Sequence, residues 1–332
     1  MMVMSKLQVI CIGEALIDKI INQSDSNFKN YLGGAPANVV CALRKLHVPA
    51  AFIGCLGDDD FGREFIQLFK QLNVNIDFLQ IVKESSTRIV KVIRDEFGDR
   101  SFSGFEVNKT NVFADEILDK LLIINNVKNL EKQFLNTKFI VTGTNLLAFS
   151  KSAETLNFIL DLAKNFRIKV IIDVNWREIF WEHSNISRDT QLKKVKNFLH
   201  NADILKLASE EALLLFDIND PSEISKVLRK QPDVIITSGA NPINWYINGQ
   251  QGSNEVVKHT SKIIDTTGAG DAFLAGLISR YYLDSNINDY SKIKENIKFA
   301  SVCGLLTCLG EGAIEQQPEE KLVYKFLNDF GS

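Results

Sequence analysis

Short apolar runs alternate with segments of helical periodicity through the second half of the chain. After a polar stretch at residues 109–136, the apolar runs cover residues 139–142, 170–174, 202–207 and 233–237. An earlier run of the same kind covers residues 7–12. Buried strands that alternate with helices are typical of a parallel sheet with helices on both faces. The alternation therefore predicts an α/β architecture, with ligands bound where the strands end.

Size and charge narrow the class of function. The chain has 332 residues, of which 45% are hydrophobic, and this is enough for one large α/β domain with a small appendage. The net charge of −3 gives no reason to expect nucleic acid or an anionic membrane as a partner. No segment is long and apolar enough to span a bilayer, so we expect a cytoplasmic location or a stroma-like compartment. Small-molecule chemistry is the function class that these features favour.

The cysteines and histidines do not predict a metal centre. The 5 cysteines lie in apolar or helical surroundings without a CxxC pair, and the 4 histidines are scattered. We expect the cysteines to be reduced core residues rather than a disulfide or zinc framework. The histidines lack the spacing of zinc ligands.

A change of pattern at residues 87–105 predicts a β-hairpin. β-Branched residues between positions 89 and 93 precede a turn, and Phe102 and Phe105 follow it. A hairpin among alternating strands and helices is suited to be a lid, and lids over sugars or nucleosides often present aromatic faces. Phe102 and Phe105 are equally explained as hairpin core.

A glycine-rich turn carries the strongest chemical signal. Ile263 and Ile264 lead into Gly268 and Gly270, and apolar residues then recur at helical spacing. A helix N-terminus offers unpaired N–H donors and a positive dipole end, and glycines let an anion come close. The turn therefore predicts a phosphate site.

Asp271 is unexpected in such a site, because its carboxylate would repel a phosphate. The carboxylate is explained if it accepts a proton from an attacking hydroxyl group, so the pattern indicates phosphoryl transfer to an alcohol. Its place in the first helical turn is expected to favour the ionised form. The alternative is that Asp271 is only a helix-start acid and the glycines only a turn.

Three segments resemble the ribokinase-like (PfkB) sugar kinases. Residues 265–273, Asp-Thr-Thr-Gly-Ala-Gly-Asp-Ala-Phe, resemble the C-terminal signature of that family. Residues 33–43, with two glycines and Asn38, are similar to its N-terminal signature. Residues 173–177 resemble the Asp-x-Asn-x-Arg element of its fructokinase-like members.

The resemblance runs in family order from residue 8 to residue 315 and implies a fold. This is a three-layer, ribokinase-like α/β fold with a mostly parallel central sheet and a small β-rich lid. One kinase domain would cover residues 1–332, with the lid formed by roughly residues 14–34 and 87–108.

The resemblance also implies roles for individual residues. Asp271 would accept the hydroxyl proton, while backbone N–H groups of Gly268, Ala269 and Gly270 would stabilise the transferring phosphoryl group. With Phe105 added from the lid pattern, the residues expected to hold the sugar are Asp18, Gly33, Gly34, Asn38, Phe105 and Arg177. Those expected to bind the nucleotide are Lys206, Thr237, Gly239, Gly268 and Gly270.

Two kinds of cation are implied in the same way. Mg²⁺ would bind with ATP and be held through water by Glu211, which is also explained as a helix N-terminal acid. K⁺ or another monovalent cation would lie near Asp265, Thr267 and Gly312. A separate acidic triplet at residues 58–60 is interpreted as a helix cap and dipole partner rather than a divalent-metal site.

The activity implied is an ATP-dependent sugar kinase, with fructose as the favoured substrate and fructose 6-phosphate as the product. The alternative substrates are 2-keto-3-deoxygluconate, ribose, aminoimidazole riboside and adenosine, because pocket shape decides among them. A different class is a non-catalytic scaffold or regulatory subunit, which Pro242 in place of a usual glycine and the lid sequence after Phe105 would favour. An exposed lid edge would suit a homodimer, and a monomer is the alternative.

Overall fold

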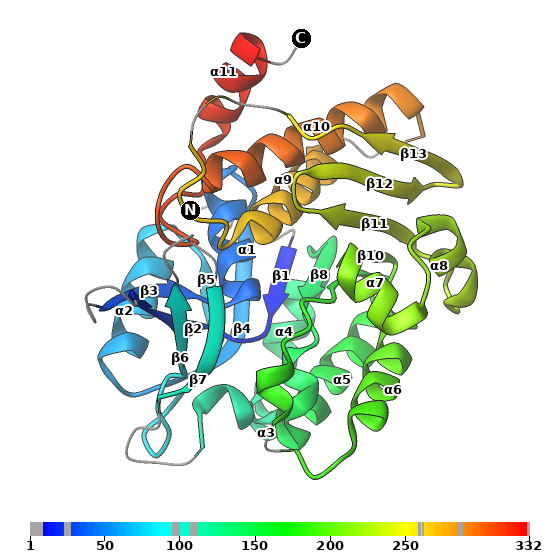
Figure 1. Ribbon diagram of the computed structural model, residues 1–332. Coiled ribbons are helices and arrows are strands. Elements are labelled where there is room, and N and C mark those ends of the chain that lie inside the picture. The colour runs from blue at the N-terminus through cyan, green and yellow to red at the C-terminus, as the bar shows by residue number, and fades with distance from the viewer. Residues whose placement is uncertain are drawn as a thin grey trace, which may run out of the picture.

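The computed structural model describes residues 9–22, 28–94, 100–106, 112–182, 184–257, 260, 262–283 and 288–330. A nine-stranded sheet forms its centre (Figure 1). Its strands in spatial order are β13 (Gln250–Asn254), β12 (Asn241–Ile247), β11 (Asp233–Ser238), β10 (Ile204–Ala208), β9 (Lys169–Asp173), β8 (Phe139–Thr142), β1 (Val9–Ile12), β4 (Ala50–Gly57) and β5 (Asn75–Val82). Neighbours from β11 to β5 pair in parallel, whereas β12 and β13 pair antiparallel, so the predicted mostly parallel sheet is confirmed.

Helices cover both faces of this sheet, because successive side chains of a buried strand point to opposite sides. In β1, Val9 and Cys11 belong to one hydrophobic cluster, and Ile10 and Ile12 belong to the other. The first cluster includes residues of α1 (Ala35–Lys45), α2 (Asp60–Gln71), α9 (Ala269–Leu283), α10 (Tyr290–Thr307) and α11 (Glu320–Phe330). The second side holds α3 (Lys120–Asn125), α4 (Val127–Phe134), α5 (Ser150–Asn165), α6 (Arg188–Leu199), α7 (Ser209–Phe216) and α8 (Pro221–Val227), with the 3₁₀ turns η1 (Ala114–Glu116), η2 (Asn145–Ala148) and η3 (Glu178–Trp181). The predicted three-layer α/β fold is confirmed.

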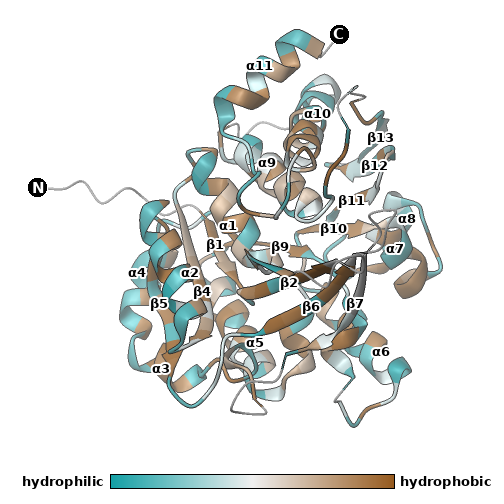
Figure 2. Ribbon diagram, turned by 60° about the vertical axis from the view of Figure 1, so that its left-hand side comes forward, coloured by the Kyte–Doolittle hydropathy of each residue, from teal (hydrophilic) through white to brown (hydrophobic). Residues whose placement is uncertain are grey.

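A second, four-stranded sheet lies beside the large one. Its strands in order are β3 (Phe28–Gly33), β2 (Leu16–Asn22), β6 (Ile89–Arg94) and β7 (Arg100–Phe105). β2 and β6 pair in parallel, and the two outer strands pair antiparallel with them, so the predicted hairpin of β6 and β7 is confirmed. Figure 2 shows β2 and β6 as largely hydrophobic strands, and the side chains of Leu16, Val90 and Val92 are buried.

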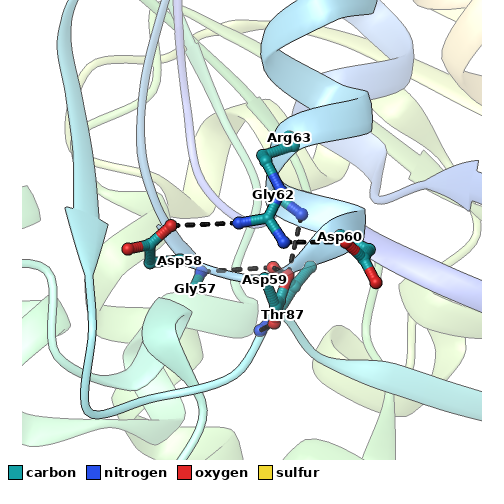
Figure 3. Close-up of polar contacts among 7 residues, drawn as sticks. All are labelled: Gly57, Asp58, Asp59, Asp60, Gly62, Arg63 and Thr87. Carbon is teal, nitrogen blue, oxygen red and sulfur yellow. Dashed lines mark hydrogen bonds and ion pairs between the residues drawn. The ribbon is translucent and has the colours of Figure 1, made fainter.

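The acidic triplet joins the large sheet to the small one (Figure 3). The carboxylate of Asp59 caps α2 by accepting from the backbone N–H of Gly62 at 2.8 Å. It also accepts from the backbone N–H and the hydroxyl of Thr87, at 2.7 and 2.8 Å, just before β6 begins. Asp58 and Asp60 pair with Arg63. The interpretation of the triplet as a helix cap is confirmed for Asp59.

The order of the strands reverses beside β1. The chain first adds β4 and β5 on one side of β1, and later adds β8, β9, β10 and β11 in turn on the other side. Segments that follow β1 and β8 therefore leave the sheet in opposite directions. Ligands of open α/β sheets bind in the crevice at the carboxyl ends of the strands at such a switch point.

The 5 cysteines are free and buried, as expected for core residues. Burial raises the pKa of the Cys41 thiol to about 12, so this side chain stays protonated at neutral pH. Among the residues that the structure describes, no helix combines the length and the apolar character needed to cross a bilayer.

Candidate active site

A cavity of about 290 Å³ lies at the switch point, between the two sheets. The small sheet contributes Leu16, Asp18, Val90 and Val92 to its lining. The large sheet and the loops after its strands contribute Glu14, Asn145, Asn175, Arg177, Phe180 and Lys206. The start of α1, the turn before α9 and the first turn of α9 contribute Gly34, Ala35, Asn38, Thr266, Thr267, Gly268, Gly270 and Asp271. A cavity of this size suits a small ligand.

The glycine-rich turn is built as the sequence predicts, directly before α9. Gly268 has φ +75°, and an added Cβ would lie 2.7 Å from the Cβ of Ala313, so only glycine fits there. The N–H of Ala269 donates to Thr266 at 3.3 Å, and no acceptor among the described residues is found for the N–H groups of Gly270 and Asp271. These first-turn donors form the positive end of the helix dipole and can bind an anion.

Asp271 lies in the first turn of α9 and reaches into the cavity. The pKa of Asp271 is raised to about 6. Burial is the largest cause, and the nearby Asp173 carboxylate acts in the same direction, while Asn38, Lys206 and Arg177 act in the opposite direction. The net shift is opposite to the one that a helix N-terminus alone would produce, because burial has the larger effect. A carboxylate with this pKa is mostly ionised at neutral pH and is a stronger base than an ordinary aspartate.

Asn38 holds the carboxylate of Asp271. The residue lies in α1, and its Nδ2 donates to Oδ2 of Asp271 at 2.7 Å. Its Oδ1 is buried and has no hydrogen-bond partner within the described part of the chain. Asn38 also lines the cavity, so it can position the Asp271 carboxylate there.

Lys206 brings a positive charge to the same place. Its Nζ pairs with both carboxylate oxygens of Asp173 at 3.0 Å, and a Cβ added at Gly270 would lie 2.9 Å from that Nζ. Burial lowers the pKa of Lys206, but Asp173, Glu211 and Asp271 outweigh burial, and the net shift is upward. The ammonium group therefore stays charged beside the turn, where it can meet a phosphate.

The loops predicted to hold a monovalent cation are brought together. Oδ1 of Asp265 accepts from the backbone N–H and the hydroxyl of Thr267, at 2.8 and 2.7 Å. Its Oδ2 accepts from the N–H of Gly312 at 3.1 Å. The carboxylate thus ties the turn before α9 to the loop after α10.

Glu211 has a structural role in the described geometry. Its two carboxylate oxygens accept from the backbone N–H groups of Trp176 and Ala208, both at 2.7 Å. It is buried, it joins the loop after β9 to the start of α7, and it does not line the cavity. These contacts fit its interpretation as a helix N-terminal acid. No group of three or more His, Cys, Asp or Glu side chains suited to a metal occurs in the described ranges.

Other predicted residues lie apart from the cavity lining. The ring of Phe105 packs against Phe113 and Phe180, which fits hairpin core rather than sugar contact. Thr237 lies near the end of β11 and Gly239 in the turn between β11 and β12, and neither lines the cavity. Gly33 acts indirectly, because an added Cβ would lie 2.6 Å from Oδ2 of Asp18.

Several lining residues were missed in the sequence. Glu14 directly follows the glycine after β1, and Asn145 lies soon after β8, so both occupy positions where ligands gather. The sequence shows that both residues follow a strand, but it does not show that β1 and β8 are neighbours in the sheet. Val90, Val92 and Phe180 carry no chemical signal of their own.

Comparison with known proteins agrees with this site. The pfkB family carbohydrate kinase profile matches residues 6–320. Fructokinase-1 of Oryza sativa subsp. japonica is 30% identical over 329 residues, covering 96% of this chain and 97% of the relative. Probable fructokinase-6, chloroplastic, of Arabidopsis thaliana is 29% identical over 331 residues, covering 96% of this chain and 82% of the relative.

Solved structures show the same fold with ligands. The fructokinase of Vibrio cholerae O395 with fructose, ADP and calcium bound has a TM-score of 0.80 at 27% identity, covering 97% of this chain and 100% of that one. A double mutant of that enzyme holds fructose, ADP and potassium, with a TM-score of 0.81 at 27% identity, 97% of this chain and 99% of that one. Members of the matched family transfer a phosphoryl group to a sugar hydroxyl, and these structures support a divalent cation with the nucleotide and a monovalent cation. With a profile match over nearly its whole length, this chain belongs to the PfkB family of carbohydrate kinases.

Proposed function

We propose that this protein is a fructokinase that transfers the γ-phosphoryl group of ATP to fructose and forms fructose 6-phosphate. The observation that carries the proposal is the placement of Asp271. Its carboxylate lies between a turn that can bind phosphate and a set of polar side chains that can bind hydroxyl groups, all in one cavity. The fructokinase relatives and the fructose-bound structure make fructose the favoured sugar.

Asp271 acts as the general base in this proposal. The hydrogen bond from Asn38 fixes Oδ2, so Oδ1 is the oxygen that faces an incoming hydroxyl group. As the sugar oxygen attacks the γ-phosphorus, its proton passes to Asp271, and the bond from phosphorus to the bridging oxygen of ADP breaks. With a pKa of about 6, Asp271 is ionised and ready to accept the proton at neutral pH.

The charge that develops on the transferred group is stabilised by the turn and by Lys206. Backbone N–H groups of Gly268, Ala269 and Gly270 would approach the phosphoryl oxygens, for which the Ala269 N–H has to leave its 3.3 Å contact with Thr266. The Lys206 ammonium adds a positive charge. Mg²⁺ bound with ATP would reduce the negative charge of the phosphates. The Asp265 carboxylate holds the two loops in place, and we propose that K⁺ binds between them.

The sugar is held by both sheets. Asp18 of β2, Asn38 of α1 and Arg177 after β9 supply polar groups, while Gly34 lets the chain pass close to Glu14. We propose that the small sheet acts as the lid, which would be formed by roughly residues 14–34 and 87–108. Residues 23–27, 95–99 and 107–108 of these ranges lie outside the described residues. Its outer strand β3 is exposed, with Phe28 55% accessible, and this edge supports a homodimer formed between two lids. The free, buried cysteines support a reducing compartment such as the cytoplasm.

The test is ADP release by the purified protein with Mg-ATP and K⁺. Fructose, ribose, 2-keto-3-deoxygluconate, aminoimidazole riboside and adenosine are offered separately. We expect turnover on fructose. Turnover only on another compound would keep the mechanism and correct the substrate, and ATP binding without turnover on any of the five would favour the non-catalytic alternative.

A further inference from the structure

The loop after α10 contacts the small sheet. Glu311 lies in this loop, and its Oε2 accepts from the hydroxyl group of Tyr31 and from Nζ of Lys29, both at 2.7 Å. Tyr31 and Lys29 belong to β3, the outer strand of the small sheet. These contacts join the small sheet to the body of the molecule at a second place, in addition to the contact of Asp59 with Thr87 just before β6.

The register of the small sheet places Tyr31 on the side of the cavity. In the antiparallel ladder of β2 and β3, Tyr31 lies directly opposite Asp18, and Lys29 lies opposite Ile20. Residues opposite each other in such a ladder have side chains on the same face of the sheet. Asp18 lines the cavity, so the contact of Tyr31 with Glu311 lies on the face of the small sheet that is turned toward the cavity.

The loop after α10 is itself held beside the glycine-rich turn. The backbone carbonyl of Cys308 accepts from the N–H groups of Ile264 and Asp265, at 2.9 and 3.3 Å, and Asp265 Oδ2 accepts from the N–H of Gly312. Gly312 has φ +86°, and an added Cβ would lie 2.7 Å from Cδ1 of Tyr31. The Tyr31 ring therefore packs on the backbone of this loop, besides its hydrogen bond.

The same loop is fixed to α1, the helix that carries Asn38. Nζ of Lys45 donates to the backbone carbonyls of Ile314 and Gln317, at 2.6 and 3.1 Å. Gln317 Nε2 donates to the backbone carbonyl of Asn38 at 2.9 Å. The first three residues of β3 are exposed, by contrast, so the small sheet is the part that would move if the contact between them broke.

Tyr31 contributes most of this contact. Burial raises the pKa of Tyr31, and the Glu311 carboxylate acts in the same direction, while Lys29 acts in the opposite one, so the phenol stays protonated and donates at neutral pH. A hydrogen bond to a carboxylate is stronger than one between neutral groups, and both partners are half-buried. Lys29 is exposed, so its ion pair with Glu311 should contribute little.

We propose that Tyr31 and Glu311 are positioning residues that hold the small sheet against the loop after α10 and keep the cavity closed during phosphoryl transfer. This inference rests on the proposed sugar kinase activity and on the small sheet as its lid. A closed cavity excludes water, which otherwise competes with the sugar hydroxyl group. In that side reaction the oxygen of water attacks the γ-phosphorus, its proton passes to Asp271, the bond to the bridging oxygen of ADP breaks, and inorganic phosphate is released.

The first test measures ADP and fructose 6-phosphate in the same reaction. Tyr31→Phe removes the hydroxyl group and keeps the ring, Glu311→Ala removes the acceptor, and Lys29→Met removes only the exposed ion pair. We expect the first two to release more ADP than sugar phosphate and to raise KM for fructose about tenfold, as for the loss of one hydrogen bond to a charged group. Lys29→Met should change this KM by less than about twofold. Combining Tyr31→Phe with Glu311→Ala should add no further loss, because both remove the same contact.

The second test needs no sugar. Backbone hydrogen exchange of the ligand-free protein reports how often β3 opens. We expect exchange within Phe28–Gly33 to be about tenfold faster in Tyr31→Phe and Glu311→Ala than in the wild type. The control is Tyr324→Phe on α11, where the tyrosine hydroxyl accepts from Nη1 of Arg280 at 2.6 Å. This variant loses a similar tyrosine hydrogen bond on another element, and both tests should give the wild-type result.

The outcomes separate this inference from the proposed function. Wild-type turnover on fructose, with an unchanged product ratio and sugar KM in Tyr31→Phe and Glu311→Ala, would overturn the inference and keep the function. Unchanged exchange of β3 in both variants would overturn it as well, whether or not the protein turns over fructose. Absence of turnover on every sugar by the wild-type protein would overturn the proposed function and with it the role of this contact in phosphoryl transfer.

Discussion

At the scale of the residue, Asp271 obtains its chemistry from its neighbours. Burial and Asp173 raise its pKa, and the hydrogen bond from Asn38 lowers it, so the balance leaves the pKa at about 6. The proposed base works only when ionised. Activity should therefore fall as the pH drops through about 6, because protonated Asp271 cannot accept the hydroxyl proton.

Asn38→Leu tests this balance. Removing the donor that lowers the pKa should raise the pKa of Asp271, so the acidic limb of kcat should move to higher pH. The measurement is kcat from pH 5 to pH 9 at saturating fructose and ATP. An acidic limb at the same pH in both proteins would show that Asp271 does not control it.

At the scale of the element, the entry into β6 is fixed by two clusters of polar contacts. The first is the Asp59 carboxylate, which caps α2 and holds Thr87. The second is Arg88, which pairs with Asp115 at 2.8 and 2.9 Å and with Glu116 at 2.8 Å. Its guanidinium lies 4.3–4.9 Å from the ring centroids of four phenylalanines, Phe105, Phe113, Phe149 and Phe180. Together they attach the small sheet to the body of the molecule.

Asp59→Ala should destabilise the protein. The change removes a helix cap, usually worth about 1 kcal/mol, and leaves the Thr87 groups without their acceptor, at a further cost of about 1–3 kcal/mol. Urea unfolding of wild-type and variant protein measures the difference. Asp60→Ala is the control, because Asp60 is exposed and its pair with Arg63 is worth less than about 1 kcal/mol. An equal loss of unfolding free energy in the two variants would contradict the proposed role of Asp59 in holding Thr87.

Arg88→Leu should have a larger effect. Asp115 is buried and would lose the cation that neutralises it, and breaking such a buried pair costs about 3–5 kcal/mol. Phe180 packs against Arg88 and lines the cavity, so we also expect a higher KM for the sugar. Unfolding in urea and sugar kinetics measure the two effects, with Arg63→Leu as the exposed control. A stable variant with a normal KM for the sugar would show that Arg88 does not position Phe180 in the cavity.

At the scale of the whole molecule, the sequence predicted the buried elements well. The run at residues 139–142 coincides with β8, because a continuous apolar run bounded by polar residues leaves little choice. β12 and β13 were missed, since their polar and apolar residues mix and Pro242 argues against a strand interior. The short helices α3 and α4 were also missed, because polar and apolar residues mix in the stretch at residues 109–136 that contains them.

The part of the candidate site that comes from one continuous segment could be predicted from the sequence. The turn before α9 holds its glycines and its acid within a few residues, and the structure places them as expected. The pair of Glu14 and Asn145 was not predictable, because its residues are 131 positions apart and meet only through the strand order. The role of Phe105 could not be decided from the sequence, because an aromatic residue of a hairpin can face either the ligand or the core. In the structure its ring lies 4.5 Å from the Arg88 guanidinium and does not line the cavity.

The central claim is that Asp271 is the base of a phosphoryl transfer to fructose. The most direct measurement is ADP release with Mg-ATP, K⁺ and fructose by wild-type and Asp271→Ala protein, with nucleotide binding measured in parallel. We predict that the variant loses about 100-fold to 10,000-fold in kcat, the usual contribution of a general base, while it binds nucleotide nearly as well as the wild type. Retention of most of the activity by Asp271→Ala would contradict the claim.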